Sequence, residues 1–142
     1  MSKVVSTRLQ DETFQRLSRI ARILDKTPSD TVATLVEESI RTIEFALIEF
    51  DSSPLGRQAF MKGSSLAVWE VIEIAQNYSM HEGQVAKHFN RPVEWVRAAF
   101  NYAEAYPEEI KLAIQDSQAI TVTDLKRLLP NLEVFMIPDD VL

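Results

Sequence analysis

Two histidines and a few carboxylates are the first residues in this chain that suggest catalytic or metal chemistry. His81 and His88 lie seven residues apart and can share one helical face, but no third ligand stands at a spacing suited to a metal. The candidate carboxylates lie on amphipathic segments, where such groups are usually solvated: Glu70, Glu73, Glu108 and Glu109. With no cysteine and three glycines, the chain offers neither a thiol nucleophile nor a glycine-rich phosphate loop. We therefore expect no enzymatic activity, no metal and no cofactor.

The basic residues gather near the N-terminus of a chain with a formal net charge of −6. Residues 1–26 carry six Lys or Arg and three Asp or Glu, whereas residues 27–50 carry one base and five acids. The tail from residue 107 carries three bases and seven acids. A basic end on an acidic body can attract phosphate to one face and repel it elsewhere. Ordinary surface variation explains the charge pattern equally well, so charge alone does not identify a binding surface.

The segment Lys3–Leu9 alternates in the manner of a β-strand. Val5, Thr7 and Leu9 fall on one face, and the other face presents Val4, Ser6 and Arg8. A lone strand leaves its backbone groups unpaired on both edges. Pairing with the same strand of a second chain satisfies those groups, so we expect a homodimer.

Two amphipathic helices are expected to follow this strand. The first begins near Glu12 with Asp11 as its cap, and it buries one apolar stripe: Phe14, Leu17, Ala21 and Leu24. The second begins at Thr27–Asp30, with Thr27 as cap and Pro28 at the first helical position, and runs to about Ile48. Its expected buried face consists of Val32, Leu35, Val36, Ser39, Ile40 and Ile43.

This order of elements over residues 3–48 resembles the ribbon-helix-helix repressors, the family of the Arc and methionine repressors. The resemblance implies an intermolecular two-stranded ribbon in the DNA major groove, which places Val4, Ser6 and Arg8 at base edges with Lys3 beside them. Arg8 is the strongest candidate, because a guanidinium can bond two acceptors of one guanine. The family also binds phosphate at the start of the second helix, which here holds Lys26, Thr27 and Ser29. Val4 departs from the usual polar reader, and the turn lacks the family's glycine.

Residues 51–56 are rich in Ser, Pro and Gly and predict a domain boundary. A small hairpin is expected from 57–60 and 66–68 around the turn at 62–65, followed by helices over 67–77, 81–89 (capped by Ser79) and 93–105. The expected inward residues of these helices are Val68, Val71, Ile72, Ala75, Val85, Ala86, Phe89, Val96, Ala99, Phe100 and Ala103.

This middle region is similar to an uncharacterised bacterial domain with a helix-turn-helix or winged-helix-like build. The matching residues are Lys62–Ser64 with Val68–Trp69, Val85–Ala86 with Phe89, and Val96–Phe100 with Tyr102. Such domains often accompany PIN-like nuclease toxins, so the resemblance implies a VapB-like antitoxin. Because the segment is nearly neutral, a protein-binding role is favoured over DNA binding.

A further helix is expected over 107–115, another from Thr121, and an apolar tail after it. That tail either folds back on the core or binds a partner protein through five large side chains: Leu132, Val134, Phe135, Met136 and Ile137. The predicted domains are thus 1–50, 55–116 and 117–142, in a mainly α-helical protein. No signal peptide and no run of about 18 apolar residues is present, which favours the cytoplasm.

The function expected from these features is that of a dimeric antitoxin in a type II toxin–antitoxin system. It would repress its own operon by binding operator DNA through residues 1–50, and its C-terminal half would neutralise a PIN-like nuclease. One alternative is a dimeric repressor without a toxin partner, whose second domain senses a ligand or another protein. The other is a dimerisation adaptor that binds no DNA.

Overall fold

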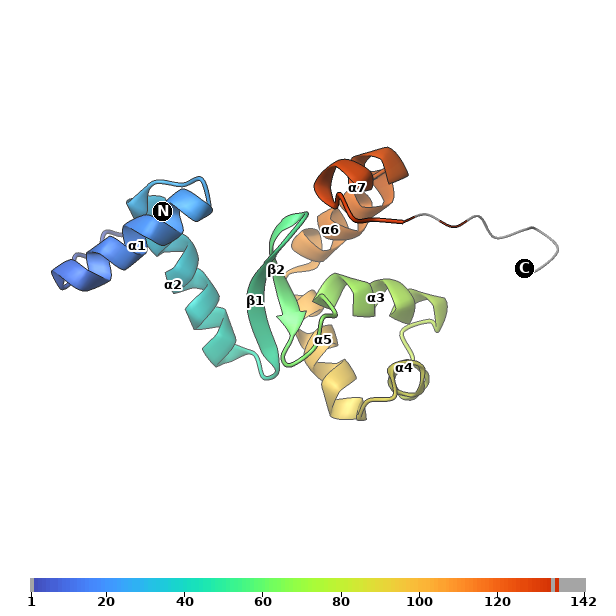
Figure 1. Ribbon diagram of the computed structural model, residues 1–142. Coiled ribbons are helices and arrows are strands. Elements are labelled where there is room, and N and C mark those ends of the chain that lie inside the picture. Colours follow the sequence, from blue (N-terminus) through green and yellow to red (C-terminus); the bar gives the residue numbers. More distant parts are fainter. Residues whose placement is uncertain (1, 134, 136–142) are drawn as a thin grey trace. The chain divides into compact units, whose positions relative to one another are not determined.

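The computed structural model of the chain describes residues 2–133 and 135, and these form a mainly helical protein with one two-stranded sheet (Figure 1). The chain divides into two compact units, which we call unit 1 (Met1–Glu44) and unit 2 (Phe45–Leu142). The division falls earlier than the sequence predicts, because residues just after Phe45 belong to a strand of unit 2. In the described part of the chain, no helix is both long and apolar enough to cross a membrane.

Unit 1 consists of an irregular N-terminal stretch and two helices, α1 (Asp11–Ile23) and α2 (Pro28–Glu44). The predicted cap of α1 is wrong, since Gln10 occupies the N-cap position and Asp11 is already helical. Asp11 and Glu12 instead lie in the first turn, where their charges favour the positive end of the helix dipole. The predicted start of α2 is confirmed, because Thr27 Oγ1 accepts a hydrogen bond from the Asp30 amide at 3.1 Å.

The second helix ends at Glu44 and does not continue to Ile48 as predicted. Leu47 has a φ of 64°, a left-handed conformation that a helix cannot contain, and Ile48 begins the first strand. Ile48 fits two patterns at once: the helical spacing of the apolar residues on α2, and the two-residue alternation of a strand that also contains Phe50. The strand places Ile48 in the core of unit 2, so burial decides between the two patterns.

Unit 2 begins with an antiparallel hairpin of β1 (Ile48–Ser53) and β2 (Gly56–Met61), in register from Ile48 opposite Met61 to Ser53 opposite Gly56. The predicted boundary at 51–56 is therefore a hairpin turn. Ser53 Oγ closes it by donating to the Gly56 carbonyl at 2.9 Å and accepting from the Leu55 amide at 3.1 Å. The predicted pairing of 57–60 with 66–68 survives only as one bridge between Phe60 and Ala67.

Five helices complete unit 2: α3 (Val68–Asn77), α4 (Glu82–Phe89), α5 (Val93–Ala105), α6 (Pro107–Ala119) and α7 (Val122–Leu128). The predicted bounds of α5 are confirmed, and α3 differs from its prediction by one residue. The predicted cap of α4 is wrong: His81 takes that position, and its Nδ1 accepts from the Gln84 amide at 3.1 Å. Ser79 is excluded from this role because it and Met80 both have left-handed backbones in the preceding turn.

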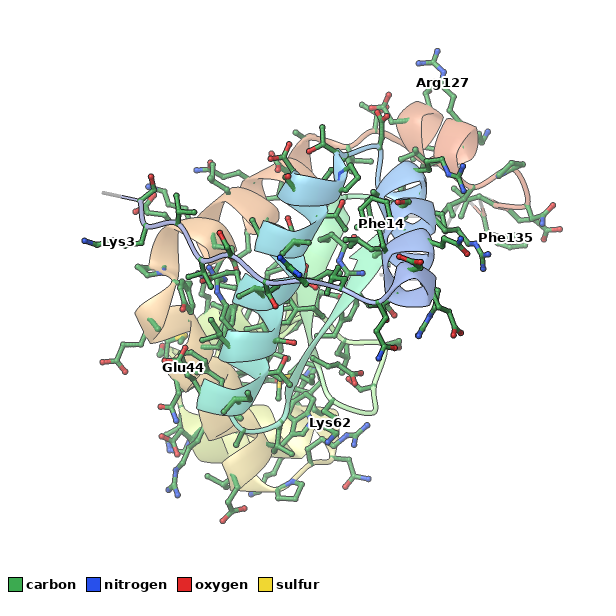
Figure 2. The ribbon with its side chains drawn as sticks, turned by 90° about the vertical axis from the view of Figure 1, so that its left-hand side faces the viewer. Lys3, Phe14, Glu44, Lys62, Arg127 and Phe135 are labelled. Carbon is green, nitrogen blue, oxygen red and sulfur yellow. The ribbon has the colours of Figure 1, made fainter. Side chains whose placement is uncertain are left out.

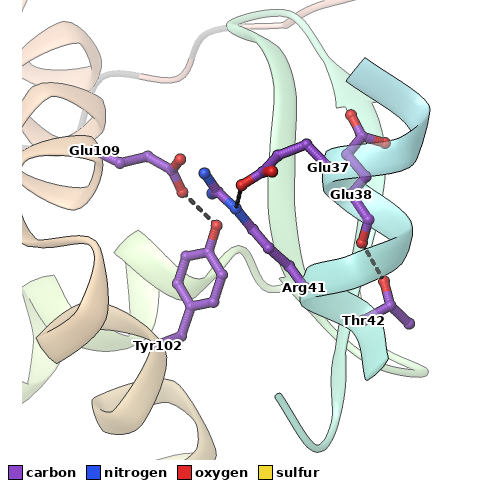
Figure 3. A network of polar contacts seen from close by, with 6 residues as sticks. All are labelled: Glu37, Glu38, Arg41, Thr42, Tyr102 and Glu109. Atoms are coloured by element: carbon purple, nitrogen blue, oxygen red, sulfur yellow. Dashed lines mark hydrogen bonds and ion pairs between the residues drawn. The ribbon is translucent and has the colours of Figure 1, made fainter. Parts of the chain in front are cut away.

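The core of unit 2 is formed by the hairpin and α3–α6. Most residues predicted to face inward on α3, α4 and α5 are buried, and Phe89, Phe100 and Ala103 pack against them partly exposed. Tyr102 is fully buried, with its ring centroid 5.4 Å from that of Phe45 and 5.0 Å from that of Tyr106. Its hydroxyl donates to Glu109 Oε2 at 2.5 Å (Figure 3), which joins α5 to α6.

Candidate nucleic-acid interface

The four residues predicted at or beside base edges lie in the stretch that precedes α1. Residues 2–10 are all exposed and have no regular secondary structure in the single chain, with Val4 93% exposed. Figure 2 shows the Lys3 side chain directed away from the ribbon. The structure thus does not fix Val4, Ser6 and Arg8 against any other element. Their predicted ribbon requires a strand from another chain and stays a prediction.

The residues predicted to bind phosphate meet at the start of α2. Thr27 Oγ1 is engaged by the Asp30 amide, and Lys26 Nζ donates to Thr34 Oγ1 at 2.9 Å, so the ammonium group lies along the first turns of the helix. Ser29 is exposed in the first turn. Asp30 lies in the same turn. Its carboxylate occupies the positive end of the helix dipole, where a phosphate would otherwise be attracted. This end of α2 is therefore a weaker phosphate site than its residue types suggest.

An open groove runs between α1 and α2 and is lined mainly by apolar side chains. Its volume is about 610 Å³. We call it the α1–α2 groove, and it is lined by Leu9, Thr13, Arg16, Leu17, Arg19, Ile20, Val32, Leu35, Val36, Ser39, Ile40 and Ile43. Val36 is 51% exposed and Ile43 86% exposed. Large apolar side chains are rarely left so exposed together in one patch unless another surface covers them.

Unit 1 has almost no core of its own. Among its described residues only Ala21 and Thr31 are buried. Apart from Ala21, the predicted burial of the α1 and α2 stripes is therefore not achieved within one chain: Phe14, Val32, Val36, Ser39, Ile40 and Ile43 are exposed, and Leu17, Leu24 and Leu35 are half-buried. A hydrophobic face of this kind stabilises a fold only when something excludes water from it.

The outer face of α5 in unit 2 is poorly suited to bind phosphate. Arg97 Nε lies 2.7 Å from Glu82 Oε2, and the guanidinium of Arg91 lies 5.4 Å from the centre of the Trp95 ring. Glu94 is exposed on the same helix. Unit 2 carries eight Lys or Arg and fourteen Asp or Glu, so it holds the entire net negative charge of the protein. Its electrostatics oppose an approach to DNA.

The two histidines serve local structure in unit 2. His81 caps α4, and His88 Nδ1 lies 3.0 Å from the Tyr78 hydroxyl. Trp69 donates from Nε1 to Gln58 Oε1 at 3.1 Å, which joins α3 to β2, whereas Trp95 is buried. Over the residues that the structure describes, no three His, Asp or Glu side chains gather in a way that could hold a metal ion.

The C-terminal residues predicted to bind a partner are described only in part. Leu132 is half-buried, and Phe135 is 80% exposed. Val134, Met136 and Ile137 lie outside the described residues. The preceding helix α7 has no buried residue and exposes two apolar side chains, Val122 and Leu128, and Leu129 just after it is also exposed.

Comparison of the chain with protein-family models, with curated proteins and with solved structures found no match in any of the three. The resemblance to ribbon-helix-helix proteins accordingly rests on the residue pattern of 3–48.

Proposed function

We propose that unit 1 forms a homodimer that binds a specific operator sequence in double-stranded DNA. The observation that carries this proposal is the open α1–α2 groove in a unit that buries only Ala21 and Thr31 among its described residues. A unit of this size with no core is not expected to be stable without a partner. A second copy is the partner that every molecule of the protein has available, and twofold pairing lets one apolar face cover its own copy.

The N-terminal stretch supports a second copy over an unrelated partner. Residues 3–9 alternate β-branched and polar side chains, yet they pair with no strand in the single chain. Two such stretches can satisfy each other's backbone groups as an antiparallel ribbon. One face of that ribbon would carry Val5, Thr7 and Leu9 toward the paired helices. The other would present Val4, Ser6 and Arg8 outward, at a width that the DNA major groove accepts.

Charge favours DNA as the ligand of this dimer. Unit 1 is neutral overall, with seven bases and seven acids, but six of its bases fall within residues 1–26. Unit 2 holds the net charge of −6, so the phosphate contacts of the protein would come from unit 1.

The proposal is tested with the full chain in two measurements. Sedimentation equilibrium should give a dimer at micromolar concentration, and selection from a pool of random duplexes should enrich a sequence with two related half-sites, since a twofold dimer reads a twofold site. A protein that stays monomeric, or a pool that shows no enrichment, would refute the proposal.

A second function is favoured by α7 and the residues after it. The exposed apolar side chains of Val122, Leu128, Leu129 and Phe135, together with the acidic character of unit 2, fit a protein partner with a basic, partly apolar surface. A nuclease must bind polyanionic RNA, for which a basic surface is expected, so neutralisation of a PIN-like toxin is the form of this function that the sequence resemblance suggests. Removing residues 121–142 should then abolish binding to a PIN-like protein encoded beside this gene while DNA binding persists. Equal affinity of the truncated chain would refute this division.

A further inference from the structure

The arginines of this chain fall into two groups that differ in whether they have partners. Every arginine after residue 40 has a close partner: Arg41 pairs with Glu37, Arg57 donates to Ser52, Arg91 stacks over Trp95, Arg97 pairs with Glu82 and Arg127 pairs with Asp124. The pair on α2 is visible in Figure 3. Among the described residues, the side chains of Arg8, Arg16, Arg19 and Arg22 make no hydrogen bond, ion pair or ring contact.

Three of these unpaired arginines form a row on one side of α1. Arg16, Arg19 and Arg22 follow each other at three-residue spacing and are exposed. At 3.6 residues per turn this row lies on the side of the helix opposite Leu17 and Ala21, which face α2. The exposed side of α1 is thus basic between Arg16 and Arg22, after an acidic first turn that holds Asp11 and Glu12. We call these three arginines the arginine row.

Nearby acids do not neutralise the arginine row. Glu12 precedes Arg16 by one turn and Asp25 follows Arg22 by three residues, positions from which a helix commonly forms ion pairs. Neither acid lies within ion-pair distance of a row arginine. A chain with 21 acids and 15 bases leaves these particular guanidinium groups without a carboxylate. Groups left in this state are available for anions outside the chain.

We infer that the arginine row binds the phosphate backbone of DNA beside the bases that the ribbon reads. This inference rests on the proposed function and adds a second contact surface to it. Three guanidinium groups along one helix suit a polyanion with regularly spaced charges more than a single small anion. Arg16 and Arg19 are also among the residues that line the α1–α2 groove. Their aliphatic stems can cover apolar surface there while the charged ends remain in water.

The test measures how salt weakens binding of the full chain to a duplex of arbitrary sequence. Each phosphate contact contributes about 0.9 to the slope of log affinity against log salt, so the six row arginines of a dimer contribute up to about 5. The variant R16Q/R19Q/R22Q should lose slope toward that extent, and R16K/R19K/R22K should restore it, because lysine keeps the charge. The matched control R91Q/R97Q/R127Q removes the same three charges from arginines that already have partners, and its slope should equal that of the unaltered protein.

Each outcome decides the matter. An unchanged slope in R16Q/R19Q/R22Q, or an equal loss in the control, would overturn the inference while leaving the proposed function standing. A triple variant that dissociates to monomers, measured by sedimentation, would place the row in the subunit interface and also overturn it. If the unaltered protein binds no duplex at all, both the inference and the proposed function fail.

Discussion

Tyr102 and Glu109 are joined across the junction of α5 and α6, where the tyrosine hydroxyl donates to the carboxylate of Glu109 at 2.5 Å (Figure 3). The Tyr102 ring is fully buried between aromatic neighbours, so only its hydroxyl reaches the edge of the core. The bond connects a buried side chain of one helix to the first turn of the next. It therefore helps to fix the turn at Pro107.

Replacing Tyr102 by Phe should lower the free energy of unfolding of unit 2 by about 1.5 kcal/mol, the lower range for a hydrogen bond to a charged group, because Glu109 remains solvated. Urea unfolding followed by tryptophan fluorescence measures this loss. Glu109→Gln keeps an acceptor and should cost less. A Tyr102→Phe protein as stable as the original would show that the bond contributes nothing.

The sequence predicted the helices of unit 2 well because their apolar residues recur with a clear helical period. The inward residues of α3 are confirmed at Val68, Val71, Ile72 and Ala75. The hairpin was mispredicted at residues 48–53, since Ile48 continues the spacing of Ile40 and Ile43 on α2 as well as beginning a strand alternation. Only the packing of Ile48 and Phe50 in the core of unit 2 distinguishes these patterns, and packing depends on residues distant in sequence.

The candidate interface could be predicted only as a list of residues. The alternation of residues 3–9 identifies Arg8 and its neighbours. Their positions in space cannot be predicted from one sequence, because the expected strand forms only with a second chain. The arginine row was not predicted as a site, although its spacing is visible in the sequence. Whether Glu12 and Asp25 form ion pairs with these arginines depends on side-chain positions, which the sequence alone does not give.

The second prediction concerns the α1–α2 groove. Ile40 is 46% exposed in the single chain, so Ile40→Asp buries no charge within one protomer. In a dimer the new carboxylate would be buried without a partner, and the dissociation constant should rise at least about 100-fold, equivalent to about 3 kcal/mol. Sedimentation equilibrium measures the change. Ala33→Asp adds the same charge to α2 outside the groove lining and should have little effect. Equal dimerisation of both variants would argue against a second copy in the groove.

The third prediction is a pH dependence of α7. Thr121 donates to Asp124 Oδ2 from Oγ1 at 2.8 Å and from its amide at 3.1 Å, and these bonds hold the pKa of Asp124 below its ordinary value of 3.8. A carboxyl whose folded pKa is lowered stabilises the fold above its unfolded pKa, and the contribution is lost as the pH falls through the folded pKa. We expect α7 to fray below about pH 3.8 before unit 2 unfolds. Amide chemical shifts at residues 122–128 report this. Asp124→Asn cannot titrate, and its α7 shifts should not change over the same range; an original protein equally insensitive to pH would contradict the cap.

The fourth prediction separates base reading from phosphate binding. Arg8 has no partner among the described residues and lies on the outward face of the predicted ribbon. Arg8→Ala should remove about 1–3 kcal/mol of sequence discrimination for each half-site, the worth of one bidentate guanine contact, while the dimer persists. The ratio of affinities for the selected duplex and for an arbitrary duplex, measured at one salt concentration, reports discrimination alone. Lys62→Ala removes an exposed cation from unit 2 and should leave that ratio unchanged.

Because the arginine row would still neutralise phosphates, Arg8→Ala should retain most of its affinity for arbitrary DNA. Loss of both affinities in equal proportion would make Arg8 a phosphate contact and remove base reading from its role.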